Sequence, residues 1–144
     1  MNKPQSLQTL GRVVSLRARE QERISLELAR QQAQLERYRR NVQRLENLCE
    51  QSGASGAMPI ALSANCADYK QAVMDLAHAQ REEAGRHETE LATTRQALHA
   101  AMRRHGAVDQ ALQRRLQGWS SVQAVRAQKT QDELATQVWW RGRT

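Results

Sequence analysis

The stretch LQTLGRVVSLRAREQERISLELARQQAQLERYRRNVQRLENLC, residues 7–49, decides the fold. Apolar residues recur in it at alternating steps of three and four, and ten of the thirteen positions in the series are apolar. A 3.5-residue period sustained over about six heptads is the signature of a coiled-coil seam. The sequence therefore predicts one long helix over about residues 5–50, with the seam Leu7, Leu10, Val14, Arg17, Gln21, Ile24, Leu28, Gln31, Leu35, Tyr38, Val42, Leu45 and Cys49.

Turn-forming residues follow this helix in one short segment. Residues 52–59 hold two Gly, two Ser and a Pro, a mixture typical of turns and loops. Ser63 or Asn65 is suited to cap a helix that starts after them. We therefore expect a loop over about residues 51–64 and a second helix over about residues 65–138.

The second helix repeats the seam in a weaker form, because small and polar side chains occupy several positions. Small residues allow two helices to approach closely, and polar residues in a seam lower its stability. We therefore expect a slender pairing of modest stability. The seam positions are Val73, Ala77, Ala84, Leu91, Leu98, Ala101, Val108, Leu112, Trp119 and Val122, together with His87, Thr94 and His105.

One break between two long helices predicts an all-α fold. It is a long antiparallel two-helix coiled-coil hairpin with a longer C-terminal helix, forming a single domain over residues 1–144. Because the second helix is too long for its partner, residues from about 116 to 138 should project beyond the first helix. This overhang carries exposed apolar residues, which are costly to leave in water and favour a binding partner. They are Leu116, Trp119, Val122, Val125, Leu134, Val138, Trp139 and Trp140.

Composition limits the classes of function that remain. The 144 residues include no Phe, three Trp and two Tyr, so a conventional globular core is not expected. The net charge is +7, from 22 Lys and Arg against 15 Asp and Glu, which favours acidic partners. The arginines are spread through both helices and interleaved with Glu, unlike the basic block of a zipper protein. We therefore expect solvated helix faces and no nucleic-acid partner.

Residues for catalysis or metal binding do not occur in suitable patterns. The four His residues are spaced nine, twelve and six apart, which does not stack pairs on one helical face as a metal site on a helix prefers. No phosphate-binding Gly-rich loop and no nucleophile motif is present. The sequence therefore predicts a protein that is not an enzyme, with no catalytic residues, no cofactor and no metal.

The two cysteines and the apolar content bear on the compartment. Cys49 and Cys66 flank the predicted loop, where we interpret each as a small apolar residue, with a disulfide across the bend as the alternative. No run of about 18 apolar residues and no hydrophobic signal core is found. We expect a cytoplasmic protein without direct membrane insertion, unless a partner holds it at a membrane surface.

Short motifs along the whole chain are similar to those of the flagellar export protein FliJ family. They are residues 6–10 (SLQTL) followed by the seam, Tyr38-Arg39 near the end of the first helix, and Asp68-Tyr69 opening the second. Residues 129–135 (KTQDELA) resemble that family's C-terminal Gln-Lys…Asp-Glu-x-Ala signature. The resemblance implies a non-enzymatic, stalk-like component of the flagellar type III protein export apparatus, peripheral at the cytoplasmic side of the inner membrane.

The resemblance also implies partners and contact surfaces. The partners would be the export ATPase FliI hexamer, the export gate protein FlhA and export chaperones, whose cycling the stalk would support. We call the residues expected to meet the ATPase the ring set: Leu7, Leu10, Val14, Trp119, Val122, Lys129, Asp132 and Glu133. We call those expected to meet the gate the gate set: Tyr38, Val42, Leu45, Cys49, Ala72, Leu76 and Ala79.

Alternatives remain open at this point. Several members of both sets also lie in the predicted seam, where packing within the hairpin explains them equally well. The same stalk in an injectisome type III secretion system, or a generic cytosolic coiled-coil scaffold, would leave a similar sequence.

Overall fold

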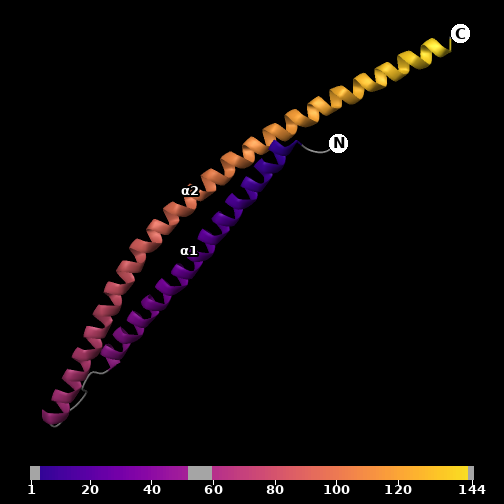
Figure 1. Ribbon diagram of the computed structural model, residues 1–144. Helices are drawn as coiled ribbons and strands as arrows, with labels where there is room; N and C mark the ends of the chain where they lie inside the picture. Colours follow the sequence, from indigo (N-terminus) through magenta and orange to yellow (C-terminus); the bar gives the residue numbers. More distant parts are fainter. Residues whose placement is uncertain (1–3, 52–59, 143–144) are drawn as a thin grey trace. The chain divides into compact units, whose positions relative to one another are not determined.

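The computed structural model describes residues 4–51 and 60–142, and these form two α-helices and no strand. Helix α1 spans Gln5–Gln51 and helix α2 spans Ile60–Arg141 (Figure 1). The predicted all-α hairpin fold with a longer second helix is confirmed. Neither helix, as far as it is described, contains a stretch long and apolar enough to cross a membrane.

Helix boundaries differ from the predicted ones mainly before α2. This helix begins at Ile60 rather than at about residue 65, so Ser63 and Asn65 lie inside it and do not cap its start. Residues 52–59 of the predicted loop lie outside the described residues. At the other end, α1 starts after Pro4, whose carbonyl accepts hydrogen bonds from the amides of Leu7 and Gln8 at 2.9 and 3.3 Å. Pro suits this place because it has no amide hydrogen to satisfy.

The chain divides into two compact units. Unit 1 combines Met1–Gln21 with Ala101–Thr144, and unit 2 comprises Glu22–Ala100. Each unit contains a segment of α1 and a segment of α2. That the two units act as a single domain stays a prediction.

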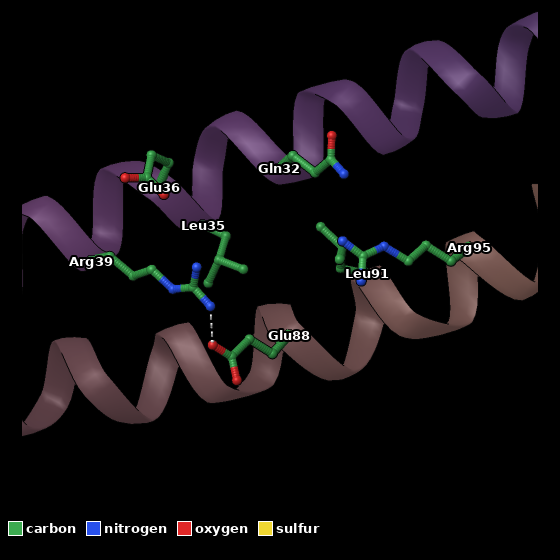
Figure 2. Close-up of a pocket in the computed structure, with 7 residues that line it drawn as sticks. All are labelled: Gln32, Leu35, Glu36, Arg39, Glu88, Leu91 and Arg95. Carbon is green, nitrogen blue, oxygen red and sulfur yellow. Dashed lines mark hydrogen bonds and ion pairs between the residues drawn. The ribbon is translucent and has the colours of Figure 1, made fainter.

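Unit 2 holds most of the buried apolar side chains. Leu35 of α1 and Leu91 of α2 are 6% and 5% exposed, and they point toward each other between the helices (Figure 2). Val73, Ala77 and Ala84 complete the core on α2. The alanines expose almost nothing despite their size, so the helices pack closely along this seam, as predicted.

Ion pairs across unit 2 show that its helices are antiparallel. Arg39 of α1 donates to Glu88 of α2 at 2.8 Å, and Arg81 of α2 pairs with Glu46 of α1 (the first pair is in Figure 2). As the residue numbers rise along α1, those of the partners fall along α2. The basic residue comes from α1 in the first pair and from α2 in the second.

The predicted seam agrees with the observed burial along α1 and over most of α2. All thirteen predicted positions on α1 are buried or half-buried. On α2 the predicted series lacked Gln80, which is half-buried between Ala77 and Ala84, and Leu116, which is half-buried between Leu112 and Trp119. The prediction of Val122 as a seam position was wrong, because this side chain is 49% exposed. The Oε1 atom of Gln80 is buried without a hydrogen-bond partner, as is the Oε1 atom of Gln31 on α1. The seam of unit 2 therefore contains two buried carbonyl groups that weaken it.

Unit 1 pairs the start of α1 with the middle of α2. Leu7 and Ala101 are buried, and Arg104 of α2 reaches Glu20 of α1 at 3.8 Å. In this unit α2 continues past the N-terminal end of α1 (Figure 1). The paired region is longer than predicted: Leu116 and Trp119 are half-buried rather than exposed, and Gln123 is the last half-buried residue. The unpaired segment therefore begins at about residue 124 rather than 116.

Candidate functional site

The first half of the ring set lies between the helices of unit 1. Leu7 is 5% exposed, and Leu10, Val14 and Trp119 are half-buried. With Glu20 beside Arg104, an antiparallel register places Leu7 opposite residues 116–119, which explains why Trp119 is partly covered. These four residues therefore pack the hairpin and offer little surface to another protein.

The second half of the ring set lies on the outside of α2. Val122 is 49% exposed, and Lys129, Asp132 and Glu133 are exposed on the unpaired segment. The structure thus separates the ring set into packing residues and surface residues. Only the surface residues are available for contact in the isolated chain.

The unpaired segment, residues 124–142, exposes every residue that it contains. It nevertheless carries five large apolar side chains: Val125, Leu134, Val138, Trp139 and Trp140. The two tryptophan rings meet edge to face, with centroids 5.7 Å apart and planes at 88°. Exposed apolar residues of this size and number are characteristic of a surface that a partner covers.

These apolar residues do not form one stripe. With 3.6 residues per turn, Val122 and Trp140 lie five turns apart on the same side of α2. Val138 lies on nearly the opposite side, and Leu134 lies about a third of a turn away from Val122. A helix with one apolar face docks on a surface, whereas a helix that is apolar on opposite sides needs to be enclosed. The segment is therefore suited to a partner that surrounds it.

The α1 members of the gate set lie in the seam of unit 2. Tyr38 stacks on His87 of α2 with ring centroids 5.0 Å apart and an interplanar angle of 24°. Val42 and Leu45 are half-buried, and so is Cys49, whose sulfur lies 3.9 Å from the carbonyl oxygen of Lys70. Packing within the hairpin accounts for each of these positions.

The α2 members of the gate set lie outside the seam. Ala72, Leu76 and Ala79 are all exposed, and their spacing of four and three places them on one face of α2. Leu76 is 50% exposed and lines a groove between the helices with Leu45. The remaining residues along this groove are Asn41, Arg44 and Gln80. The gate set therefore offers a contact surface around Leu76 and Leu45, whereas its other α1 members are covered by packing in the seam.

Metal ligands are not gathered anywhere in the described residues: no group of three His, Cys, Asp or Glu side chains is placed to hold an ion. One groove of unit 2 has a charged rim and is lined by Gln32, Leu35, Glu36, Arg39, Glu88, Leu91 and Arg95. The Arg39–Glu88 ion pair bridges the two helices there, beside Leu35 (Figure 2). Cys49 and Cys66 are both half-buried free thiols.

One charged feature escaped the analysis of the sequence. Unit 2 carries five exposed arginines on α1, which we call the arginine row: Arg23, Arg30, Arg37, Arg40 and Arg44; the first and the last of them also line grooves between the helices. Four of the five are spaced seven residues apart, so they lie along one line of the helix. The spacing of seven can be seen in the sequence. It was missed because glutamates alternate with these arginines along the chain, which suggested that no side of the helix is predominantly basic.

Comparison with known protein families gives one match. A family model described as the flagellar FliJ protein matches residues 6–144. No curated protein and no solved structure matches the chain.

Proposed function

This chain belongs to the flagellar FliJ protein family, and from that premise we propose that it is the stalk of a flagellar export apparatus. The family belongs to the cytoplasmic side of this apparatus, where its members are non-enzymatic components of protein export. The proposal adds the partners: the hexameric export ATPase FliI, the export gate protein FlhA, and the export chaperones whose cycling the stalk supports.

One observation supports insertion into an ATPase ring more than any other. Residues 124–142 are exposed throughout and are apolar on opposite sides of the helix. A ring that surrounds this segment covers both sides at once, whereas a flat surface or a single partner helix covers one. Lys129, Asp132 and Glu133 lie between the apolar residues and provide polar contacts to the wall of the pore.

The gate is proposed to contact unit 2 around Leu76 and Leu45. Their groove combines an apolar centre with the polar rim of Asn41, Arg44 and Gln80, the arrangement common at protein interfaces. Ala72 and Ala79 flank Leu76 on α2 and let a partner approach the helix closely. Tyr38, Val42 and Cys49 then support this surface from within the seam.

In such an assembly the chain acts mechanically. A helix with different residues on its two sides makes unequal contacts with the six subunits of a ring, which favours ring assembly and biases the hydrolysis cycle. A second surface on the same chain then couples that cycle to the gate. The chain itself performs no chemical step.

The decisive experiment compares the full-length chain with a truncation after Gln123 in a binding and ATP hydrolysis assay with the export ATPase. This cut removes the unpaired segment and keeps every half-buried residue of unit 1. Circular dichroism should therefore show an intact hairpin. We expect full-length protein to bind and raise hydrolysis, and the truncated protein to do neither. Equal stimulation by both proteins would contradict ring insertion by this segment.

A separate experiment addresses the gate and the flagellar assignment. Leu76→Glu should abolish binding to the cytoplasmic part of the gate protein while leaving stimulation of the ATPase unchanged. A matched substitution at another exposed apolar residue of unit 2, Leu26→Glu, should leave gate binding unchanged. Restored motility in a strain that lacks its own stalk would assign the chain to the flagellum; restored secretion in an injectisome mutant alone would assign it to that system.

A further inference from the structure

The arginine row gives unit 2 a one-sided charge. One outward line of α1 in this unit comprises residues 23, 26, 30, 33, 37, 40, 44, 47 and 51, of which five are Arg and none is acidic; the adjoining line 22, 29, 36, 43 and 50 contains three Glu. Successive members seven residues apart are separated by about 10 Å along the helix, and the row extends over about 30 Å. It is therefore a straight, evenly spaced line of positive charge.

The opposite side of unit 2 lacks such a line. The equivalent outward positions of α2 are Asp75, Ala79, Glu82, Arg86, Thr89, Thr93 and Gln96. They include two acidic residues and one basic residue. The positive charge of unit 2 thus lies on the outer side of α1 and not on both sides of the hairpin.

Some acidic residues nearby pair away from the row, whereas Glu22, Glu36 and Glu50 are exposed on the adjoining outward positions of α1. Glu88 pairs with Arg39 and Glu46 pairs with Arg81, both across the seam and away from the row. Within the row, Arg30 approaches Glu27 at 3.6 Å, and its own side chain is 83% exposed. In the described structure Arg23, Arg37 and Arg44 make no ion pair. The row therefore presents exposed guanidinium groups along one line of α1, with three glutamates on the adjoining line.

We propose that the arginine row binds the surface of an anionic lipid bilayer, with this part of α1 lying flat against the headgroups. A bilayer surface is flat and presents lipid phosphates all along a straight helix, and guanidinium groups bind phosphate through paired hydrogen bonds. Clusters of four to eight basic residues on a helix are typical of proteins that bind acidic lipids. Leu26 lies on the same line and is 67% exposed, which suits shallow insertion between the headgroups.

Other acidic partners fit the row less well. A protein interface is organised around buried apolar and aromatic residues, and Leu26 is the single large apolar residue on this line. The major groove of DNA curves away from a straight helix, so five arginines over about 30 Å cannot all stay in contact with it. The lipid site lies on unit 2 and does not depend on ring insertion, so either proposal can fail while the other stands.

The test is vesicle flotation with the full-length chain. Vesicles contain about one third phosphatidylglycerol in phosphatidylcholine, or phosphatidylcholine alone, at about 0.05 M and about 0.5 M NaCl. We expect flotation with the anionic vesicles only, and a marked loss at the higher salt concentration. Duplex DNA is the second probe, and it should bind more weakly than the anionic vesicles at equal phosphate concentration.

Two triple variants with the same net charge locate the site. R30Q/R37Q/R44Q removes part of the row, and R86Q/R103Q/R114Q removes three exposed arginines from the outer side of α2. Gln and Arg have similar helix propensities, so both variants should keep the circular dichroism spectrum of the parent chain. Each charge near an anionic surface changes the partition coefficient about five-fold, so the first variant should lose about 100-fold and the second less than about five-fold.

Three results would overturn the proposal. Absence of flotation with anionic vesicles would show that the row does not bind lipid. Equal losses in the two variants would assign binding to overall charge rather than to the row. Tighter binding to DNA than to vesicles, lost in the first variant alone, would assign the row to nucleic acid.

Discussion

Two regions of α2 place apolar residues in opposite ways. Along residues 73–98, in unit 2, apolar and small residues recur at steps of three and four, and all of the seam positions are buried or half-buried. Along residues 124–141, in unit 1, larger apolar residues lie on opposite sides of the helix and all are exposed. Residues 73–98 therefore form part of the core although their side chains are smaller. Residues 124–141 do not, although they include Trp139 and Trp140.

The difference shows that pattern, rather than apolar content, decides what a helical segment does. A regular seam can be covered by one partner helix. Helix α1 is this partner, so the apolar residues of 73–98 are buried within the chain. An irregular distribution cannot be covered by one helix and stays exposed until something encloses it.

Shortening a core side chain should change the unfolding free energy most. Leu91→Ala removes a side chain that is buried against Leu35, and losses of this kind cost about 2–3 kcal/mol of unfolding free energy. Urea unfolding followed by circular dichroism measures the change. Leu26→Ala, at an exposed position of α1, is the control and should change the unfolding free energy by less than about 0.5 kcal/mol. Similar losses in both variants would show that the seam is not the core of unit 2.

Replacing a buried polar residue of the seam by an apolar one should give the next largest change in the unfolding free energy. The Oε1 atom of Gln80 is buried without a partner, so Gln80→Leu should raise the unfolding free energy by about 1–2 kcal/mol. Gln96→Leu, at an outward position of α2, should give no comparable gain in the same urea titration. A Gln80→Leu variant no more stable than the parent would indicate that water satisfies this carbonyl.

The ion pair between Arg39 and Glu88 should contribute less to the unfolding free energy. Both side chains are more than half exposed, and pairs of this kind are worth about 0.2–1 kcal/mol. A double-mutant cycle with Arg39→Ala and Glu88→Ala measures the coupling, and about 0.5 M NaCl should weaken it. The intrahelical pair of Arg86 with Glu83 is the reference. A coupling that is insensitive to salt would contradict the exposed geometry.

Removal of both terminal tryptophans should have almost no effect on the isolated chain. Trp139→Ala with Trp140→Ala removes exposed rings that contact each other rather than a core, so the unfolding free energy should change by less than about 0.5 kcal/mol. Stimulation of the export ATPase, in contrast, should fall. A clear drop in stability, especially one that depends on protein concentration, would show that these rings are already covered by a second copy of the chain.

The fold was largely predictable because a 3.5-residue period states directly which positions are buried. The extent of pairing was not, since it depends on the register of the two helices. The sequence placed the start of α2 at about residue 65, but the helix begins at Ile60, and its pairing with α1 extends to about Gln123. Trp119 is therefore half-buried, although the predicted lengths of the two helices placed it in the overhang.

The candidate surfaces were predictable only in part. Apolar residues in both sets were chosen by resemblance, and periodicity already placed Leu7, Tyr38 and Cys49 in the seam, where the structure finds them covered. Leu76 and Val122 are exposed and remain available for contact. The arginine row was missed because charges were judged by their order along the chain, whereas their spacing of seven determines which side of the helix they share.

The two ion pairs across unit 2 have a consequence for sliding of one helix along the other. A seam rich in alanine offers few bulky knobs to oppose a shift by one heptad. Such a shift in one direction would bring Arg39 beside Arg81, and in the other direction Glu46 beside Glu88. Like charges face each other in both cases, which is destabilising. Because each helix contributes one cation and one anion, the hairpin resists slippage both ways and can transmit a push along its axis.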